Sequence, residues 1–321
     1  SQKYYLNAGG TYYDITPIRK TTTGAATFTA TDGSSTITVT DADHGANLND
    51  FVTFTNASAF HGSGNITAAV INQEYQVTSA PTSNTYTFEA KDTSGATVTA
   101  NASDSGNGGS GVDGVYQINS GLANGVGGTG WGAGTWGRGT WGSAASIGVT
   151  TQLRLWSHDN FGENLIINPR DGGIYYWIKD DGFSNRAVEI GTIGGANETP
   201  VIAKQILVSD VDRHVIAFGT NPVGSTTQDP LLIRFSDQEN VLDWNPTATN
   251  TAGDLRIGTG SQFVKAIETK REIVVFTNSS VHSMQFIGAP FTFGIQPLAS
   301  NITIMGPNAA VAVEDAVFWM G

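Results

Sequence analysis

The residues of this chain that could ligate a metal or act on a substrate are few and widely spaced. The chain has five histidines: His44, His61, His158, His214 and His282. No two of them have the HxH or HExxH spacing that is typical of a metal site. Asp210 and Asp212 could flank a cation, but an Asp-x-Asp sequence in a turn more often accepts backbone N–H groups. No phosphate-binding loop, GxSxG motif or dinucleotide motif is present, and no carboxylate pair can be assigned to acid–base hydrolysis. We therefore predict no catalytic residue, no metal site and no cofactor, and expect a protein that is not an enzyme.

One short segment matches a calcium-binding pattern. Residues 108–116 read GGSGVDGVY and fit the nonapeptide GGxGxDxUx. A single copy cannot build a calcium β-roll, because each turn of such a roll takes ligands from its neighbours. A glycine-rich linker produces this match by chance, so we do not count the segment as a calcium site.

Three tryptophans recur at a five-residue interval in the glycine-rich residues 127–142: Trp131, Trp136 and Trp141. Exposed indoles stack on sugar rings, so the repeat could bind carbohydrate. Tryptophan is also enriched where domains or subunits meet, and the flanking glycines allow close backbone approach. We predict that these three side chains are mostly buried at a domain or subunit interface. Full exposure of all three would favour glycan binding.

Composition favours an all-β protein. The 321 residues include 40 glycines and many threonines, serines and asparagines, and only 14% of the residues are charged. Absence of cysteine excludes disulfide scaffolds, thiol catalysis and cysteine-based zinc sites. The net charge of −12 argues against tight phosphate binding but would let DNA pass without adhering. No apolar run approaches the ~20 residues that span a bilayer, so we expect no membrane span.

The first part of the chain predicts two β regions. Residues 1–21 form a hairpin, with strands near 4–6 and 12–15, that supplies the first strands of the main domain. Residues 22–104 form an inserted β-barrel or β-sandwich domain with alternating strands at 36–39, 52–55, 75–78, 86–90 and 96–99. Residues 105–145 are a linker rich in glycine and tryptophan, and residues 103–114 provide its flexible start.

Residues 146–321 carry longer and more apolar strands. Groups of strands begin near residues 164, 214, 272 and 316, at steps of 50, 58 and 44 residues. Four-stranded blades that repeat at about 40–50 residues are typical of a β-propeller. The last strand, at 316–320, is followed at once by Gly321, so we expect an incomplete final blade and a longer parent protein.

Several motifs resemble the tail nozzle proteins of short-tailed bacteriophages, also called tail tubular B or packaged-DNA stabilisation proteins. They are residues 14–19 (DITPIR), 130–142, 153–157 (LRLWS), 161–165 (FGENL), 172–177 (GGIYYW), 233–239 (IRFSDQE), Trp244 and 317–321 (VFWMG). Residues 27–90, with His44 and Gly45 before the strand at 51–54, are similar to a small β module inserted in such phage proteins.

The resemblance implies a structural virion protein of the phage tail. Nozzle proteins are β-propeller subunits that form a six-fold ring below the portal and adaptor, retain packaged double-stranded DNA and conduct it during ejection. It implies contacts with tail adaptor proteins and with tail fibres or spikes. A receptor-binding or host-glycan-binding phage adhesin is the alternative. A propeller hydrolase is a third class, which would need converging carboxylates in a central pocket.

Overall fold

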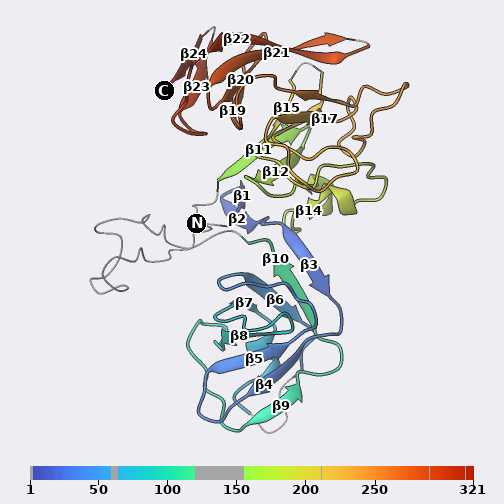
Figure 1. The fold of residues 1–321 in the computed structure, drawn as a ribbon. Coiled ribbons are helices and arrows are strands. Elements are labelled where there is room, and N and C mark those ends of the chain that lie inside the picture. The colour runs from blue at the N-terminus through green and yellow to red at the C-terminus, as the bar shows by residue number, and fades with distance from the viewer. Residues whose placement is uncertain (1–2, 59–63, 120–154, 211, 289, 315) are drawn as a thin grey trace, which may run out of the picture. The chain divides into compact units, whose positions relative to one another are not determined.

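The structure is a computed structural model that describes residues 3–58, 64–119, 155–210, 212–288, 290–314 and 316–321. The prediction of an all-β fold is confirmed, because the described residues form antiparallel sheets with one short α-helix and two 3₁₀ turns (Figure 1). None of the described helices has the length and apolar character needed to cross a membrane. The chain divides into two compact units, the first within residues 1–7 and 16–154 and the second within 8–15 and 155–321.

The first unit is a sandwich of two four-stranded antiparallel sheets, ordered β3-β10-β6-β7 and β8-β5-β4-β9. Its elements are β3 (Ile18–Thr22), β4 (Thr27–Ala30), β5 (Thr36–Thr40), β6 (Phe51–Thr55), α1 (Ala68–Ile71), β7 (Glu74–Gln76), β8 (Thr85–Glu89), β9 (Asp104–Asn107) and β10 (Asp113–Gln117). Alternating residues of both sheets fill one core, in which Phe28 packs edge-on against Phe54 with ring centroids 5.0 Å apart.

Two segments of this unit differ from the sequence-based expectation. The prediction of a flexible linker at residues 103–114 is wrong, because these residues contribute β9 and the start of β10, a central strand of its sheet. The prediction of a strand at residues 96–99 is also wrong, because this segment forms only a single bridge, between Lys91 and Thr97. Glycine in β10 serves packing, because a Cβ on Gly114 would lie 3.0 Å from Thr22 Oγ1.

The second unit contains three consecutive four-stranded antiparallel sheets, in each of which the strands pair in chain order. The first is β11 (Trp156–Phe161), β12 (Asn164–Pro169), β13 (Tyr175–Trp177) and β14 (Val188–Glu189), with η1 (Lys179–Asp181) and η2 (Ile190–Thr192) beside it. The second is β15 (Gln205–Val208), β16 (Val215–Phe218), β17 (Leu232–Phe235) and β18 (Gly253–Arg256). The third is β19 (Phe263–Glu268), β20 (Ile273–Thr277), β21 (Ser280–Gly288) and β22 (Thr292–Ser300).

Two hairpins complete the described strands. β23 (Ala310–Val313) pairs with β24 (Ala316–Trp319) after the third sheet, and β1 (Tyr5–Ala8) pairs with β2 (Thr11–Asp14) near the N-terminus. The division between the two units falls within the β1–β2 hairpin. Arg186 binds Asp14 at 2.9 Å, and the Ala187 N–H donates to Ile15 O at 3.4 Å, so the end of this hairpin contacts the segment before β14.

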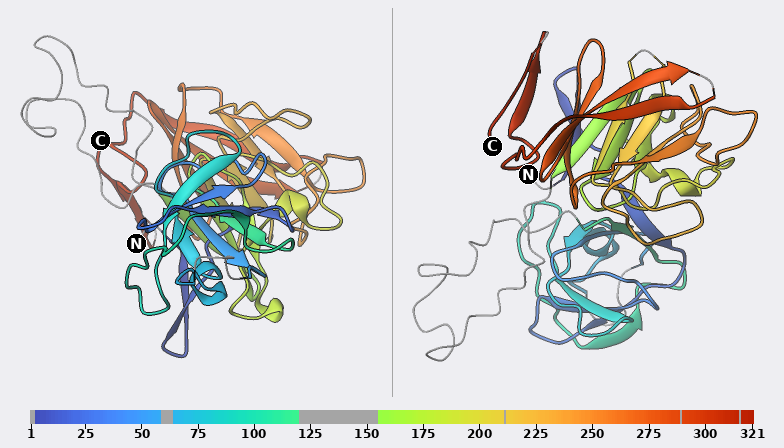
Figure 2. Two further views of the ribbon diagram at one scale, coloured as in Figure 1. Left: turned by 90° about the horizontal axis from the view of Figure 1, so that it is seen from below. Right: turned by 45° about the horizontal axis from the view of Figure 1, so that its top comes forward.

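The strands that begin the sheets of the second unit contact one another, and β12 also contacts β15 and β18 contacts β22. β11 contacts β15, β15 contacts β19, and β19 contacts β23, and we call these four the first strands. All four are labelled in Figure 1, and Figure 2 shows the same ribbon from two further directions. They begin at residues 156, 205, 263 and 310, at steps of 49, 58 and 47 residues. The sequence-based repeat length is therefore close to the observed one, but its starting points at 164, 214, 272 and 316 mark the second strand of each sheet. The predicted starting points were wrong by one strand, because β11 and β19 carry polar and charged side chains while the strands that follow them are more apolar.

Candidate functional site

The four first strands line one cavity of about 400 Å³, which we call the first-strand cavity. Its walls come from residues 156–159 of β11, 205–207 at the start of β15, 265–268 of β19 and 310–312 of β23. Each of these strands is the edge of its own sheet, so backbone groups on its outer side need partners other than a paired strand. Side chains of the neighbouring first strands supply many of them.

β11 supplies acceptors to β15 at two positions. Ser157 Oγ accepts the Ile206 N–H at 3.1 Å, and Asp159 Oδ2 accepts the Val208 N–H at 2.9 Å. The residue numbers rise together on the two strands, so β11 and β15 run in the same direction. Alternate side chains of one edge strand thus satisfy alternate amides of the next.

The joint between β15 and β19 follows the same rule. Gln205 donates from Nε2 to Ala266 O at 2.8 Å and accepts the Ala266 N–H through Oε1 at 3.0 Å. Beyond the end of β15, the Asp210 N–H donates to Glu268 Oε1 at 3.0 Å. A two-bond amide contact at one end and a carboxylate contact at the other therefore connect the second sheet to the third.

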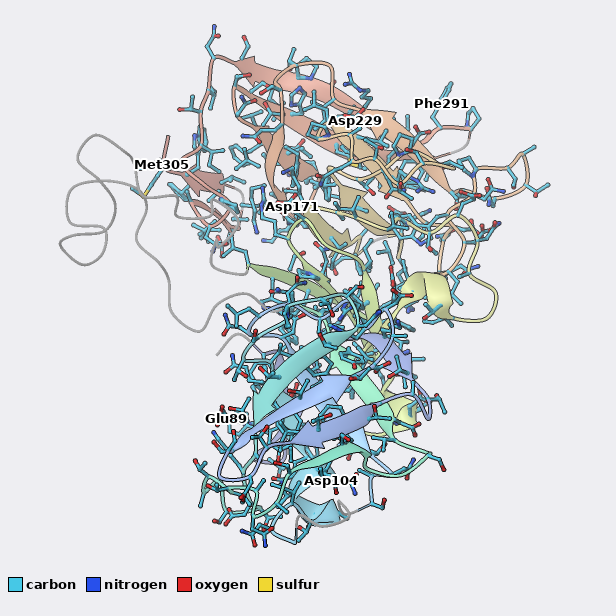
Figure 3. The ribbon with its side chains drawn as sticks, turned by 60° about the horizontal axis from the view of Figure 1, so that its bottom comes forward. Glu89, Asp104, Asp171, Asp229, Phe291 and Met305 are labelled. Atoms are coloured by element: carbon cyan, nitrogen blue, oxygen red, sulfur yellow. The ribbon has the colours of Figure 1, made fainter. Side chains whose placement is uncertain are left out.

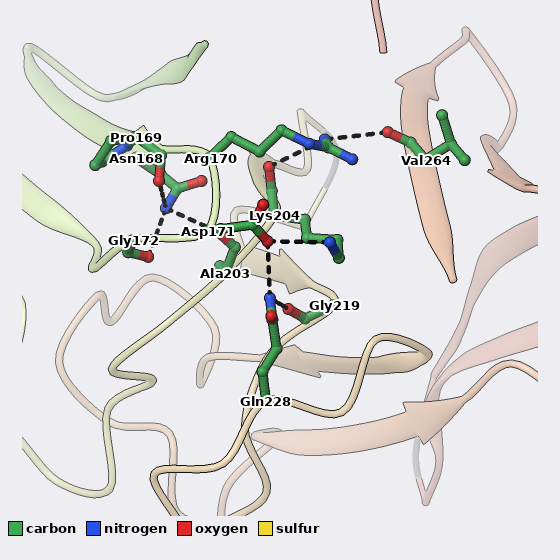
Figure 4. A network of polar contacts seen from close by, with 10 residues as sticks. All are labelled: Asn168, Pro169, Arg170, Asp171, Gly172, Ala203, Lys204, Gly219, Gln228 and Val264. Atoms are coloured by element: carbon green, nitrogen blue, oxygen red, sulfur yellow. Dashed lines mark hydrogen bonds and ion pairs between the residues drawn. The ribbon is translucent and has the colours of Figure 1, made fainter. Parts of the chain in front are cut away.

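The turn between β12 and β13 reinforces the N-terminal ends of the first strands (Figure 4). Arg170 donates from Nη1 to Lys204 O at 3.4 Å and to Val264 O at 3.2 Å, so a residue of the first sheet reaches the third. Asp171 pairs with Lys204 at 3.0 Å and accepts from Gln228 Nε2 at 3.2 Å. These contacts hold the three sheets together on the side where the first strands begin.

The C-terminal ends of the first strands bring four carboxylates together: Asp159, Asp210, Asp212 and Glu268. Burial raises the pKa of Glu268 to about 7, and the negative charges of the three aspartates add to the effect. Burial also raises the pKa of Asp212. Glu268 can therefore gain or lose a proton near neutral pH.

The opposite end of the cavity is cationic. Lys265 lines the wall, and its pKa is lowered by burial and by the positive charge of Arg170. Burial lowers the pKa of Arg170 as well. The first-strand cavity is thus positive where the strands begin and acidic where they end. An arrangement of this kind can orient a dipolar group or exchange a proton at Glu268.

The candidate residues of the sequence analysis are not gathered at one site. Trp131, Trp136 and Trp141 lie outside the described residues, as does His61, so their predicted interface role stays a prediction. Among the other histidines, His44, His214 and His282 are buried in three different places, and only His158 lines the first-strand cavity.

The residues weighed as metal ligands have other partners or neighbours. Asp113 of the calcium-like segment accepts the Gly24 N–H at 2.8 Å and the Asn56 amide at 2.8 Å. Asp210 and Asp212 belong to the carboxylate group at the first-strand cavity. Within the part of the chain that the structure describes, no group of three or more His, Asp or Glu side chains is placed to hold a metal ion.

Sequence reasoning missed Ser157, Asp159, Gln205 and Glu268, which join the first strands. Ser157 and Asp159 lie in the mostly polar β11, whereas Gln205 begins β15 and Glu268 ends β19, so no shared sequence pattern marks the four residues. Asp159 and Glu268 are more than a hundred positions apart in the sequence, so only the repeat of sheets brings them together.

No family model matches the chain, and no curated protein matches it. Among solved structures, a phage phi92 endosialidase is matched over 83% of this chain and 35% of that chain, with 12% sequence identity and a TM-score of 0.21. The match thus spans about a third of the length of that structure. At this TM-score it carries no argument about fold or activity.

Proposed function

We propose that this chain is a structural protein of a bacteriophage virion, a tail nozzle subunit that assembles into a ring, retains packaged DNA and conducts it during ejection. The observation that carries the proposal is the series of four-stranded antiparallel sheets joined through their first strands around one cavity. Such sheets are the blades from which propeller subunits are built. The motif resemblance then favours a nozzle over other propeller proteins.

The net charge of the second unit supports a role in conducting DNA without binding it tightly. The second unit contains 19 of the 28 carboxylates of the chain but only 10 of its 16 lysines and arginines. A surface with this excess of negative charge repels phosphates. A ring of such subunits would let DNA slide through without adhering.

Virions assembled without this protein test the proposal. A nozzle retains DNA, so particles that lack it should package DNA and then lose it, and adding the purified protein during assembly should restore full particles. DNA-filled particles that cannot attach to the host would contradict the proposal. That outcome would favour the adhesin alternative, for which the exposure of Trp131, Trp136 and Trp141 is the deciding feature.

A hydrolase is a second candidate, favoured by the convergence of Asp159 and Glu268 on the first-strand cavity. A carboxyl group with a pKa near 7 can act as a general acid beside an ionised carboxylate. Both side chains also accept backbone N–H groups of a neighbouring strand segment, which ranks the structural role first. Cleavage of a host polysaccharide by the intact chain, abolished by Glu268→Gln, would promote this candidate, and absence of cleavage would remove it.

A further inference from the structure

Three polar side chains meet at one face of the β3-β10-β6-β7 sheet of the sandwich: Lys3, Glu74 and Gln117. Glu74 begins β7, and Gln117 ends β10. Lys3 precedes β1 in the sequence and belongs to the same compact unit as the other two. The first-strand cavity is lined by other residues, so this cluster has no part in the site described above.

The strand register explains why the cluster lies on one face. In the pairing of β10 with β6, Val115 lies opposite Thr53, and the same register places Gln117 opposite Phe51 two residues further along. In the pairing of β6 with β7, Glu74 lies opposite Thr53. Alternate residues of a strand share a face, so Gln117, Phe51 and Glu74 all lie on the side of the sheet that faces away from the sandwich core.

Glu74 connects the other two members of the cluster. Its Oε1 pairs with Lys3 Nζ, and its Oε2 accepts a hydrogen bond from Gln117 Nε2. Groups that bind the two oxygens of one carboxylate lie side by side, so the amine and the carboxamide are neighbours. Lys3 Nζ also lies 4.4 Å from the centroid of the Phe51 ring. The aromatic face and the carboxylate together fix the position of the amine.

The carboxamide of Gln117 is closed off from solvent. Gln117 is 1% exposed, and its Oε1 is buried without a hydrogen-bond partner among the described residues. The Lys3 side chain is only 11% exposed. A carboxylate repels a carbonyl oxygen, so Glu74 holds the amide with its nitrogen inward and its oxygen away. The amide nitrogen therefore faces the one group of the cluster that can hand it a proton.

We propose that Lys3 and Gln117 become joined by an isopeptide bond between Lys3 Nζ and Gln117 Cδ, with Glu74 as the proton carrier. Glu74 takes a proton from the Lys3 ammonium, and the freed amine attacks Cδ. The bond from Cδ to Nζ forms, and the bond from Cδ to Nε2 breaks. The amide nitrogen leaves as ammonium, with the two protons that Lys3 gives up. Every atom comes from the two side chains, and nothing is oxidised or reduced.

The arrangement of the cluster supplies what this reaction requires. Reacting groups that are held in contact behave as if their concentration were very high, with effective molarities of about 10⁵–10⁸ M in well-oriented cases. A carboxylate that touches both the attacking and the departing nitrogen can relay protons between them without solvent. The bond forms once in the lifetime of each molecule, so even a slow reaction completes it.

The bond would close residues 3–117 into one loop that contains every strand of the sandwich. Gln117 ends the last of these strands. The Tyr4 N–H donates to Thr16 Oγ1 at 2.9 Å, which holds the segment around Lys3 beside the point where the chain enters the first of them. Tension applied to the chain outside the loop then passes through the isopeptide bond and not through the strands. The inserted sandwich is protected in this way against being pulled open.

Mass spectrometry of the purified full chain tests the bond. The linked chain should be lighter than its sequence mass by one molecule of ammonia. Trypsin should release residues 1–19 joined to residues 92–138, because cleavage follows Arg19, Lys91 and Arg138 but not a lysine whose amine is in an amide. Cyclisation at an asparagine also releases ammonia, so the joined peptide pair, and not the mass alone, identifies the bond.

Two variants test the roles of the amine and the carboxylate. Lys3→Arg keeps a cation beside Glu74 but removes the attacking amine, and Glu74→Gln keeps the shape of the side chain but cannot carry the proton. Both should have the full sequence mass and yield unlinked peptides, with circular dichroism spectra like that of the wild type. Glu89→Gln is the matched control and should keep the link, because Glu89, labelled in Figure 3, lies on β8 of the other sheet and accepts from Thr36 Oγ1 at 2.7 Å.

Two results would overturn the inference. A wild-type chain with the full sequence mass and a free Lys3 would show that the cluster is held only by non-covalent contacts. A link that persists in Glu74→Gln would show that Glu74 does not carry the proton. Neither result depends on whether the chain forms a nozzle, so this inference and the proposed function can fail separately.

Discussion

Replacing Glu268 by glutamine tests how the sheets are held at the acidic end of the first-strand cavity. Burial and the neighbouring aspartates raise the pKa of Glu268 from 4.5 to about 7 in the folded chain. The folded protein therefore holds this proton more tightly than the unfolded chain does, and stability is lost as pH rises from about 4.5 to about 7. Glutamine cannot ionise, yet its carbonyl oxygen can still accept the Asp210 N–H.

The size of the effect follows from this shift and from partial exposure. One pH unit corresponds to about 1.36 kcal/mol, so a fully buried group would contribute about 3 kcal/mol. Glu268 is only half-buried, and screening by solvent reduces the expected effect to about 1–2 kcal/mol at pH 8. For a unit of this size, Glu268→Gln should then melt roughly 2–8 °C above the wild type at pH 8.

Differential scanning calorimetry at pH 4.5 and pH 8 measures this difference. The variant and the wild type should melt at nearly the same temperature at pH 4.5 and separate as pH rises, and comparison at each pH cancels the titration of all other groups. Glu163→Gln is the control, because the Glu163 side chain is 74% exposed in a surface pair with Lys179. An equal difference at both pH values, or a less stable variant at pH 8, would refute the reasoning.

Two further substitutions test packing in the two units. A Cβ on Gly253 would lie 2.6 Å from the Phe235 ring, so Gly253→Ala should lower the free energy of unfolding by about 1–3 kcal/mol. Gly194→Ala is the control, because a Cβ there meets no atom within 4 Å and should change stability little. Equal melting temperatures of the two variants would contradict this reasoning. Tyr116 Oη donates to the buried Asp41 carboxylate at 2.6 Å. Tyr116→Phe removes this hydrogen bond and should lower the free energy of unfolding of the sandwich by about 1.5–3 kcal/mol, as measured by urea denaturation. An unchanged denaturation midpoint would show that the hydrogen bond contributes nothing to stability.

The sequence predicts the second strand of each sheet better than the first. β16 (Val215–Phe218) and β20 (Ile273–Thr277) are buried on both faces, so they are continuous apolar runs that are visible without a structure. β11 reads WSHDNF, because it lines a cavity and supplies acceptors to the next sheet. A strand whose side chains replace a paired neighbour has no simple apolar pattern. The repeat length could therefore be predicted, but its starting point could not.

The glycine content of residues 106–114 also misleads a prediction from sequence. The glycines of residues 106–114 indicate a flexible linker by composition, yet a Cβ on Gly108 would lie 2.4 Å from the Phe28 ring. Gly108 also has a φ of +112°, which other residues rarely adopt. Gly114 lies against Thr22 and Tyr116 inside the sandwich. Close packing and flexibility both select glycine, and composition alone does not separate them.

The symmetry of the assembled protein tests the central claim most directly. Cryo-electron microscopy of purified virions or of the purified chain at high concentration would give this symmetry from averaged end-on views. A closed six-fold ring of identical copies around an open channel is the predicted result. A monomer, or a single copy attached at the side of the tail, would contradict the proposal that this chain is a nozzle subunit.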